Sequence, residues 1–367
     1  MKLIHCGDIH LDSQLTTKLS KEKAQERNRE LWMTFEELVA FAVQEQVQVI
    51  LICGDLFDTD CPANYLVQEF FELVEEHSQI SFFYVRGNHD RKKFWKSEEA
   101  LPDNFYVFKT PFQQYKYGKV TITGAQCEGE SLEEDLQYLQ LDENQYNIVM
   151  LHGMAVNTLQ QDSTEDQIPL LKLQNQGIDY LALGHIHTYE KYVLDQRGCY
   201  CYCGCLEGRG FDECGEKGFV YMELWEDDFS LRTQFVPFGK RRVYVIDVDV
   251  EQCVSSMQMV RRIEETMENS MVREKDYVRV RIVGDLPAEV EKNLSYIESA
   301  FWDSYYYFEI EDKTQYAIPY DAYQNQKTLR GEFVRLVEEL EIAEEEKNQI
   351  LRFGMLALSG EELPECN

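Results

Sequence analysis

Residues 47–58 of the 367-residue chain read VQVILICGDLFD. The apolar part, residues 47–53, is typical of a β-strand that is buried on both faces, because it is nearly continuous rather than alternating. The polar part contains Asp55 and Asp58 and falls where the strand ends and a loop begins. Open α/β sheets bind ligands beyond the carboxyl ends of their strands. The stretch therefore predicts an α/β fold with a functional site at one edge of its sheet.

The residues on either side alternate between strand-like and helix-like patterns. Residues 2–6 favour a strand, residues 21–46 an amphipathic helix, and residues 80–85 a strand that follows a helical pattern ending near His77. This alternation predicts a βαβ architecture. Residues 189–238 show strands only, as expected for a second sheet that completes a sandwich. Further predicted strands lie at residues 120–123, 146–151 and 178–183.

The C-terminal third has its own pattern. Residues 240–318 alternate strand, helix, strand, helix and strand, which predicts a compact βαβαβ module. Residues 319–367 contain two helical patterns, 327–340 and 344–358, which predict a hairpin too small to fold alone and therefore a candidate partner-binding segment. Residues 1–239 would form the main domain. The predicted elements of the small domain are residues 243–250, 253–268, 277–283, 288–300 and 305–310.

Five polar motifs follow predicted strands. Taken singly each is a weak signal, since a Gly-Asp pair is usually a turn and an isolated histidine is more often a surface or core side chain. As an ordered set they indicate a metal site, because carboxylates and imidazoles gathered at strand ends are costly without a cation. Five of the seven histidines belong to them. The motifs are Asp8-Ile9-His10, Gly54-Asp55-Leu56-Phe57-Asp58, Gly87-Asn88-His89-Asp90, His152-Gly153 and Gly184-His185-Ile186-His187.

The residue types in these motifs predict which metals the site would bind. Carboxylate, amide and imidazole ligands together suit Mn²⁺, Fe or Zn²⁺ better than Mg²⁺ or Ca²⁺, which prefer oxygen alone. One carboxylate can bridge two ions about 3.5 to 4 Å apart, and such a pair activates water for attack on phosphorus. Asp55 is the natural bridging residue.

The ordered motifs resemble the D-x-H, G-D-x-x-D, G-N-H-D, H and G-H-x-H signature of the calcineurin-like metallophosphoesterases. The resemblance implies a four-layer α/β/β/α sandwich, a small α/β capping or DNA-binding domain at residues 240–318, and a C-terminal helical hairpin. It implies that His89, oriented by Asp90, stabilises the transition state or protonates the leaving oxygen. It also implies that Asp8, His10, Asp55 and His187 hold one ion, and that Asp55, Asn88, His152 and His185 hold the other.

Two further stretches narrow the resemblance. Residues 202–213, YCGCLEGRGFDE, are similar to the Y-S-G-S-x-x-x-R-x-F-x-E stretch of SbcD-type DNA repair nucleases, and residues 328–333, TLRGEF, to their C-terminal region. This implies a manganese-dependent 3′-to-5′ exonuclease, with endonuclease activity on single strands, that works with a coiled-coil ATPase of the SbcC type. Cysteines replace the usual serines. Asp58 stands where archaeal and eukaryotic relatives tend to have His, which bears on specificity for duplex ends.

The net charge of −31 does not fit a protein that grips nucleic acid by itself. We therefore expect weak intrinsic affinity for DNA, supplemented by the partner. Candidate substrate-binding side chains are the basic residues after Asn88 and one in the first SbcD-like stretch, against the alternative that they are solvated surface charges. They are Arg91, Lys92, Lys93 and Arg209.

The eleven cysteines are an odd number, and the N-terminus lacks the apolar stretch of a secretion signal. Reduced thiols and a cytoplasmic location are therefore expected, and no apolar run reaches the roughly 20 residues of a membrane helix. Four cysteines alternate along one stretch, which predicts small buried side chains on one strand face, with a metal or redox role as the alternative. They are Cys199, Cys201, Cys203 and Cys205.

Three other functions stay open at this point. A phosphoesterase of small nucleotides or phosphomonoesters fits the acidic charge but leaves the extra domains unexplained. A phosphoprotein phosphatase has no distinguishing feature in this sequence. A non-catalytic scaffold with the same fold would not need the complete set of ligands. The native metal, the polarity of digestion and the oligomeric state, with a homodimer as one alternative, do not follow from the sequence.

Overall fold

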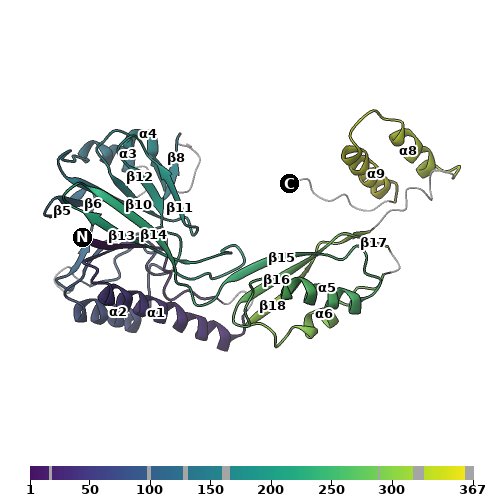
Figure 1. The fold of residues 1–367 in the computed structure, drawn as a ribbon, viewed down its shortest axis with the longest axis horizontal. Helices are drawn as coiled ribbons and strands as arrows, with labels where there is room; N and C mark the ends of the chain where they lie inside the picture. The colour runs from purple at the N-terminus through teal and green to yellow at the C-terminus, as the bar shows by residue number, and fades with distance from the viewer. Residues whose placement is uncertain are drawn as a thin grey trace. The chain divides into compact units, whose positions relative to one another are not determined.

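The structure is a computed structural model, and it describes residues 1–15, 19–96, 101–126, 131–158, 166–287, 290–316 and 326–359. The chain forms two compact units, Met1–Tyr244 and Val245–Asn367, and each is described by itself (Figure 1). The domain boundary predicted at residue 240 lies close to the break after Tyr244. The boundary predicted at residue 319 falls within residues 317–325, outside the described residues. The division into three domains therefore stays a prediction.

The first sheet has six strands in the order β14-β13-β1-β2-β3-β4. Strands β1 to β4 are parallel to one another, and β13 pairs antiparallel with the other edge of β1. Every residue of β2 is buried, as its nearly continuous apolar sequence predicts. The strands are β1 Lys2–Cys6, β2 Val49–Cys53, β3 Ser81–Val85, β4 Phe105–Val107, β13 Gly218–Trp225 and β14 Ser230–Pro237.

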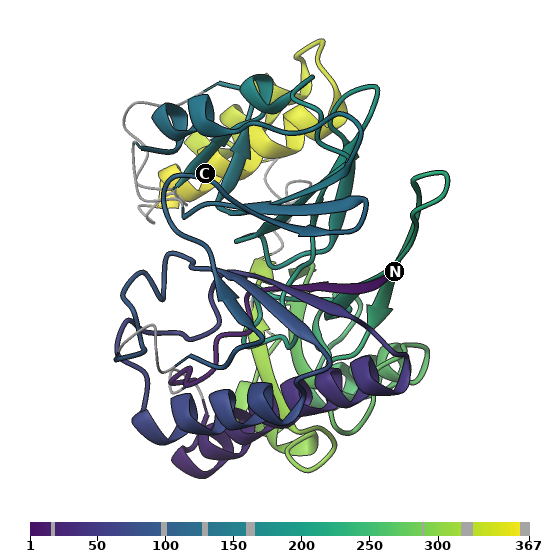
Figure 2. The same cartoon turned by 90° about the vertical axis from the view of Figure 1, so that its left-hand side faces the viewer.

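Two helices, α1 (Lys21–Gln44) and α2 (Asn64–Glu76), cover the outer face of this sheet (Figures 1 and 2). The side chain of Ser20 caps α1 by accepting a hydrogen bond from the backbone N–H of Lys23. The apolar residues of α1 at helical spacing pack against the sheet in one core cluster. These are Leu31, Phe35, Leu38 and Ala42, each at most 1% exposed.

The second sheet has the strand order β11-β12-β10-β7-β6-β5 and faces the first (Figure 2). Side chains such as Leu51 and Phe83 from the first sheet meet Ile148 and Ala182 from the second in a shared core. Helices α3 (Ser131–Asp135) and α4 (Leu170–Leu173) lie on its outer side. The strands are β5 Gln113–Tyr117, β6 Val120–Gly124, β7 Tyr146–His152, β10 Tyr180–Gly184, β11 Glu190–Val193 and β12 Cys199–Tyr202.

The α/β class predicted from the sequence is confirmed. Residues 189–238 form strands, as predicted, but they do not all join one sheet: β11 and β12 extend the second sheet, whereas β13 and β14 extend the first. The reason is the unpaired edge of β1, whose backbone groups need hydrogen-bond partners. A short parallel pair, β8 (Met154–Val156) and β9 (Gln167–Pro169), was not predicted.

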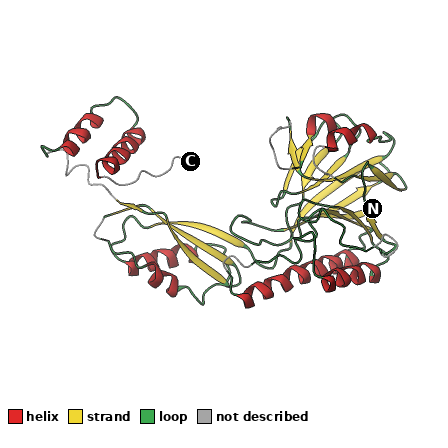
Figure 3. Cartoon of the chain, turned by 180° about the vertical axis from the view of Figure 1, so that it is seen from behind, coloured by secondary structure: helices red, strands yellow, loops and turns green. Residues whose placement is uncertain are grey.

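In the second unit, helices α5 and α6 lie on one face of a three-stranded sheet with the order β15-β16-β18 (Figure 3). The strand–helix–strand–helix–strand pattern agrees with the sequence prediction, although α6 is shorter than residues 288–300, of which 288 and 289 lie outside the described residues. The elements are β15 Val243–Asp249, α5 Ser256–Glu268, β16 Tyr277–Val283, β17 Asp285–Leu286, α6 Leu294–Ala300, β18 Tyr307–Asp312 and β19 Gln315–Tyr316.

The predicted helical hairpin consists of α8 (Leu329–Glu338) and α9 (Glu344–Ser359). Its apolar stripe differs from the predicted one, Phe333, Leu336, Val337 and Leu340. Val334 and Val337 pack against α9, whereas Leu336 and Leu340 are 57% and 43% exposed. Among the described residues, no helix combines the length and the apolar content needed to cross a bilayer.

Candidate metal centre

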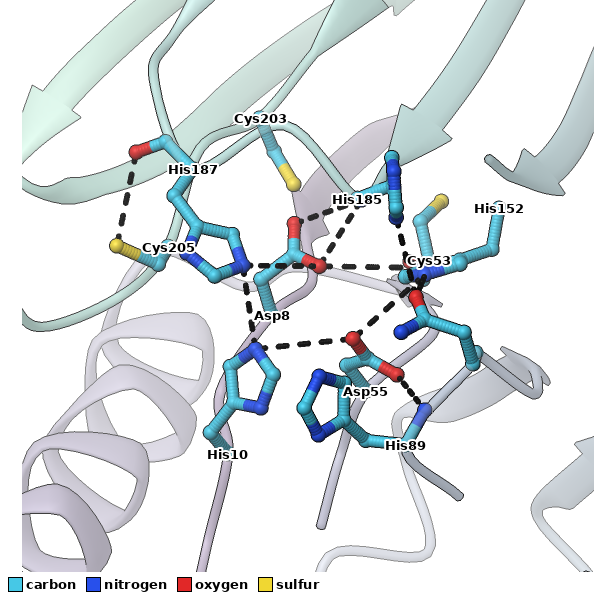
Figure 4. Close-up of polar contacts among 12 residues, drawn as sticks. Asp8, His10, Cys53, Asp55, His89, His152, His185, His187, Cys203 and Cys205 are labelled. Atoms are coloured by element: carbon cyan, nitrogen blue, oxygen red, sulfur yellow. Dashed lines mark hydrogen bonds and ion pairs between the residues drawn. The ribbon is translucent and has the colours of Figure 1, made fainter. Parts of the chain in front are cut away.

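The five polar motifs lie in loops at the carboxyl ends of strands in both sheets. Because β1, β2 and β3 are parallel neighbours, and β7 and β10 likewise, these loops emerge at the same end of each sheet. The two sheets pack face to face, so the loops of both meet at one place (Figure 4). Asp8 and His10 follow β1, Asp55 follows β2, Asn88 and His89 follow β3, His152 ends β7, and His185 and His187 follow β10.

Four residues of the centre have left-handed backbone conformations. The φ angles are 47° at Asp8, 49° at His10, 46° at Asp55 and 96° at His185. Side chains other than glycine avoid this region, so these residues are held there by their surroundings. The backbone N–H groups of Asp8 and His10 donate to the carbonyls of Gly54 and Asp55, at 3.1 Å and 2.9 Å. The two loops therefore fix each other.

Two motif glycines allow a close approach of the chain. At Gly87 a Cβ atom would lie 2.1 Å from Oδ1 of Asp55, and at Gly184 it would lie 1.8 Å from the carbonyl oxygen of Cys53. Neither contact is sterically allowed. The glycines are thus required by packing around the centre, in addition to any turn they form.

One group of ligand atoms centres on two imidazoles. Nε2 of His187 lies 3.2 Å from Nε2 of His10 and 3.9 Å from Oδ1 of Asp8. The other ring nitrogens face carboxylates: Nδ1 of His10 is 2.8 Å from Asp58, and Nδ1 of His187 is 2.7 Å from Glu213. Each carboxylate favours a proton on Nδ1, and the two Nε2 atoms are turned toward the same point.

A second group centres on the Asn88 side chain. Its Oδ1 lies 2.9 Å from Nε2 of His152 and 3.0 Å from Nδ1 of His185. Nδ1 of His152 is 2.9 Å from the carbonyl oxygen of Cys53, which accepts its proton and leaves Nε2 as a lone pair. Oδ2 of Asp55 lies 3.6 Å from Nε2 of His152 and 3.7 Å from Nε2 of His10. Asp55 therefore stands between the two groups.

These donor sets fit divalent cations. The two buried carboxylates, Asp8 and Asp55, repel each other unless positive charge lies between them. Burial lowers the pKa of His10 to about 4 and that of His185 to about 4, the latter with help from neighbouring His152, so both rings are neutral at pH 7. Burial raises the pKa of Asp8 to about 6. Asp8, His10 and His187 converge closely enough for one ion, and Asp8, Asp55 and His152 for another.

His89 lies at the open side of the centre, with 43% of its side chain exposed. Its backbone N–H donates to Asp55, and Nδ1 is 3.3 Å from Oδ1 of Asp58. The predicted orienting residue, Asp90, is instead fully buried. Its carboxylate accepts hydrogen bonds from the backbone of Leu56, Phe57 and Gly87 and from the Tyr84 hydroxyl. Asp58 is therefore the carboxylate beside the His89 ring, and Asp90 stabilises the backbone of the loops instead.

The predicted substrate-binding side chains have varied surroundings. Arg91 is 2.7 Å from Asp166, and Lys92 is 3.2 Å from Asp60. Lys93 is exposed. Arg209 differs from these three because only 17% of its side chain is exposed and its guanidinium contacts Asp58 and Glu213. A role for all four in substrate binding stays a prediction.

The four cysteines lie in β12 and in the segment that follows it. Cys201 and Cys203 belong to the core between the two sheets, and the described cysteines are all free. Burial raises the pKa of Cys201 to about 12, which keeps it as a thiol. Strand β12 ends at Tyr202, so Cys203 and Cys205 lie beyond it rather than on one strand face as predicted.

Sequence reasoning missed the carboxylates behind the histidines. Glu213 stood out only as part of a family-like stretch, and Asp58 only as the last residue of a motif and as a departure from relatives. Both contacts join residues far apart in the sequence, such as His187 with Glu213 and His10 with Asp58, and no local periodicity reports them. For Glu213, the sequence offered one signal: an acidic residue after a turn, four positions after Arg209.

A sequence profile of the family described as "Calcineurin-like phosphoesterase" matches residues 1–189, just over half of the 367-residue chain. The matched segment contains all five polar motifs, from Asp8 to His187. It ends before Arg209 and Glu213.

Curated relatives are similar at low identity. The metallophosphoesterase YhaO of Bacillus subtilis is 27% identical over 64% of this chain, which covers 60% of that protein's length. The DNA double-strand break repair protein Mre11 of Sulfolobus acidocaldarius is 25% identical over 78% of this chain and 76% of its own length. The SbcD component of the nuclease SbcCD of Staphylococcus epidermidis is 24% identical over 69% of this chain and 74% of its own length.

Proposed function

The chain belongs to the calcineurin-like phosphoesterase family, and on this basis we propose that it is a nuclease that hydrolyses phosphodiester bonds of DNA. Members of the family bind two divalent metal ions and hydrolyse phosphate esters, so the chain is a metal-dependent hydrolase. The observation that carries the proposal is the position of Asp55 between two groups of converging ligand atoms. DNA as the substrate is proposed from the Mre11 and SbcD relatives.

In this proposal each residue of the centre has a defined task. Asp8, His10, Asp55 and His187 would hold one ion, and Asp55, Asn88, His152 and His185 the other. Two bound cations supply charge neutralisation of the phosphoryl oxygens and a more acidic attacking water. The exposed imidazole of His89 can donate a proton to the leaving oxygen, and Asp58, at 3.3 Å, orients its ring.

A cavity lined by residues of β4, of β5 and of the loop after β3 would suit a polynucleotide substrate. Its volume is about 520 Å³, and it begins at Arg86, in the loop that carries Asn88 and His89. Its walls combine cationic and aromatic side chains, the combination that holds the phosphates and bases of single strands. A phosphomonoester would not need it. Among the lining residues are Arg86, Lys93, Trp95, Tyr106, Lys109 and Tyr115.

The net charge of −31 favours the alternative, a phosphoesterase of small nucleotides or phosphomonoesters. A direct comparison decides between them. With Mn²⁺ present, we expect the purified chain to degrade labelled single-stranded DNA and a chromogenic phosphodiester, and to leave a chromogenic phosphomonoester almost untouched. Preferential hydrolysis of the monoester, or of 2′,3′-cyclic nucleotides over DNA, would favour the small-substrate alternative.

Manganese is the metal we propose, with Fe and Zn²⁺ as alternatives, because nitrogen and oxygen ligands are mixed. A cytoplasmic location belongs to the same proposal, and the free cysteines of the described residues fit a reducing compartment.

The helical hairpin is proposed as the contact with a coiled-coil ATPase of the SbcC type. Leu329 and Leu336 in α8 are 73% and 57% exposed, and Leu340, just beyond its end, is 43% exposed, so the hairpin has apolar surface that its own two helices do not cover. Truncation after Ala322, which lies outside the described residues, is therefore expected to leave hydrolysis of a chromogenic phosphodiester and the melting temperature nearly unchanged.

The full chain should co-purify with such an ATPase, and the truncated chain should not. The double substitution Leu336→Asp and Leu340→Asp should give the same loss without shortening the chain. Aggregation or unfolding of the truncated chain by itself would mean that the hairpin packs against its own protein.

A further inference from the structure

The side chain of Arg209 joins two carboxylates that stand behind different histidines. Its Nη1 donates to Oδ1 of Asp58 at 2.9 Å, and its Nη2 donates to Oε1 of Glu213 at 2.8 Å. The backbone N–H of Arg209 also donates to Oε2 of Glu213, at 2.7 Å. The side chain of Glu213 is 4% exposed, so this ion pair lies largely out of water.

Each carboxylate faces the ring nitrogen that does not point into the centre. Asp58 lies 2.8 Å from Nδ1 of His10, and Glu213 lies 2.7 Å from Nδ1 of His187. The Nε2 atoms of these two histidines are 3.2 Å apart. The guanidinium group of Arg209 thus contacts both carboxylates, and these carboxylates orient the imidazoles of His10 and His187 toward the same point.

A second contact strengthens the same arrangement. Nζ of Lys217, which is 4% exposed, donates to the backbone carbonyl of His187 at 2.7 Å. The backbone and the ring of His187 are therefore both fixed from the segment that contains Arg209. The ligands of the other group, His152 and His185, have no contact with Arg209, Asp58 or Glu213 among the hydrogen bonds and ion pairs of the described residues.

We propose that Arg209 and Glu213 are positioning residues for the ion held by His10 and His187, rather than substrate-binding groups. The inference rests on the proposed two-metal function. Partners that orient a metal-binding imidazole typically contribute about 10- to 100-fold in metal affinity. Because Arg209 acts through Asp58 and Glu213, its loss affects one of the two ions and leaves the other.

Mn²⁺ titration of the metal-free protein, followed by calorimetry and by electron paramagnetic resonance, tests the proposal. Wild type should bind two ions and show the spectrum of a coupled pair. In Arg209→Met one ion should bind as in wild type and the other about 10- to 100-fold more weakly, so that a mononuclear spectrum persists at low Mn²⁺. Glu213→Gln, nearly isosteric, should behave in the same way and covers the case in which Arg209→Met does not fold.

Two further variants distinguish positioning from general stability. Arg209→Lys, which can reach one carboxylate at a time, should restore part of the lost affinity. Arg197→Met removes an arginine that pairs with Asp179 at the opposite end of β10, and should leave both affinities unchanged. Equal weakening of both ions in Arg209→Met, or unchanged binding of both, overturns the positioning role. A wild-type protein that binds no Mn²⁺ overturns the proposed function itself.

Discussion

Asp55→Asn is expected to abolish binding of both ions and to reduce phosphodiester hydrolysis by about 10³-fold or more, since charge stabilisation by a metal pair is worth several kcal/mol. Oδ2 of Asp55 lies within 4 Å of the Nε2 atoms of His10 and His152, one imidazole from each ligand group. The amide keeps the shape and can still accept the hydrogen bond from the backbone of His89, but it has no charge to share between two cations. Metal content after equilibrium dialysis against Mn²⁺, with turnover of a chromogenic phosphodiester, measures both effects.

The same substitution should change the stability of the metal-free fold little. Burial, and to a smaller extent Asp55, raise the pKa of Asp8, whereas the imidazoles of His152 and His10 lower the pKa of Asp55 although its burial acts the other way. Because loss of the Asp55 charge removes both the repulsion from Asp8 and the attraction to the imidazoles, the melting temperature of metal-free Asp55→Asn should lie close to that of metal-free wild type. Asp228→Asn, in an exposed turn, serves as the control. A variant that loses activity but still holds two ions would show that Asp55 is not the bridge.

His89→Ala is expected to keep both ions and to lose about 10²- to 10⁴-fold in turnover, the usual contribution of a general acid. The ring of His89 is exposed and contacts Asp58, while its backbone N–H, which the substitution retains, donates to Asp55. The ligand geometry should thus survive. Turnover should be measured with one substrate that has a good leaving group and one that has a poor leaving group. Loss of a proton donor slows the substrate with the poor leaving group more, so this comparison tests whether His89 donates a proton.

His77→Ala is the matched control, since His77 lies at the end of α2 and contacts the carbonyl of Leu73. Two outcomes would contradict the role of His89 as a proton donor that does not bind metal. Loss of one ion in His89→Ala would make His89 a ligand, and an unchanged rate with the poor leaving group would remove it from proton transfer.

The local parts of the structure could be predicted from the sequence. The strand at residues 277–283 agrees with β16 at both ends, because its apolar and polar residues alternate and turn residues flank it. The motif residues could be identified for a similar reason: each follows directly after an apolar strand, so its position depends on few neighbours. The short β4 was missed because three residues are too few for a periodic signal.

Contacts between distant segments could not be predicted. Whether β13 would pair with the first or the second sheet depends on which edge is open, and that is a property of the assembled sheet. The contacts of Asp58 with Arg209, and of Arg27 with Glu207, likewise join residues that only the complete fold brings together. The resemblance implied that Asp90 orients His89, whereas its buried carboxylate accepts hydrogen bonds from the loop backbone.

The left-handed backbone at Asp8, His10, Asp55 and His185 bears on the amount of this protein in a cell. Such conformations cost of the order of 1 to 3 kcal/mol each, which is a large part of the roughly 5 to 15 kcal/mol that separates folded from unfolded chains. A ligand that binds only the folded chain restores stability as its free concentration rises. When the metal is scarce, more chains would open and be degraded by proteases. Metal supply would then set the abundance of the enzyme as well as its activity.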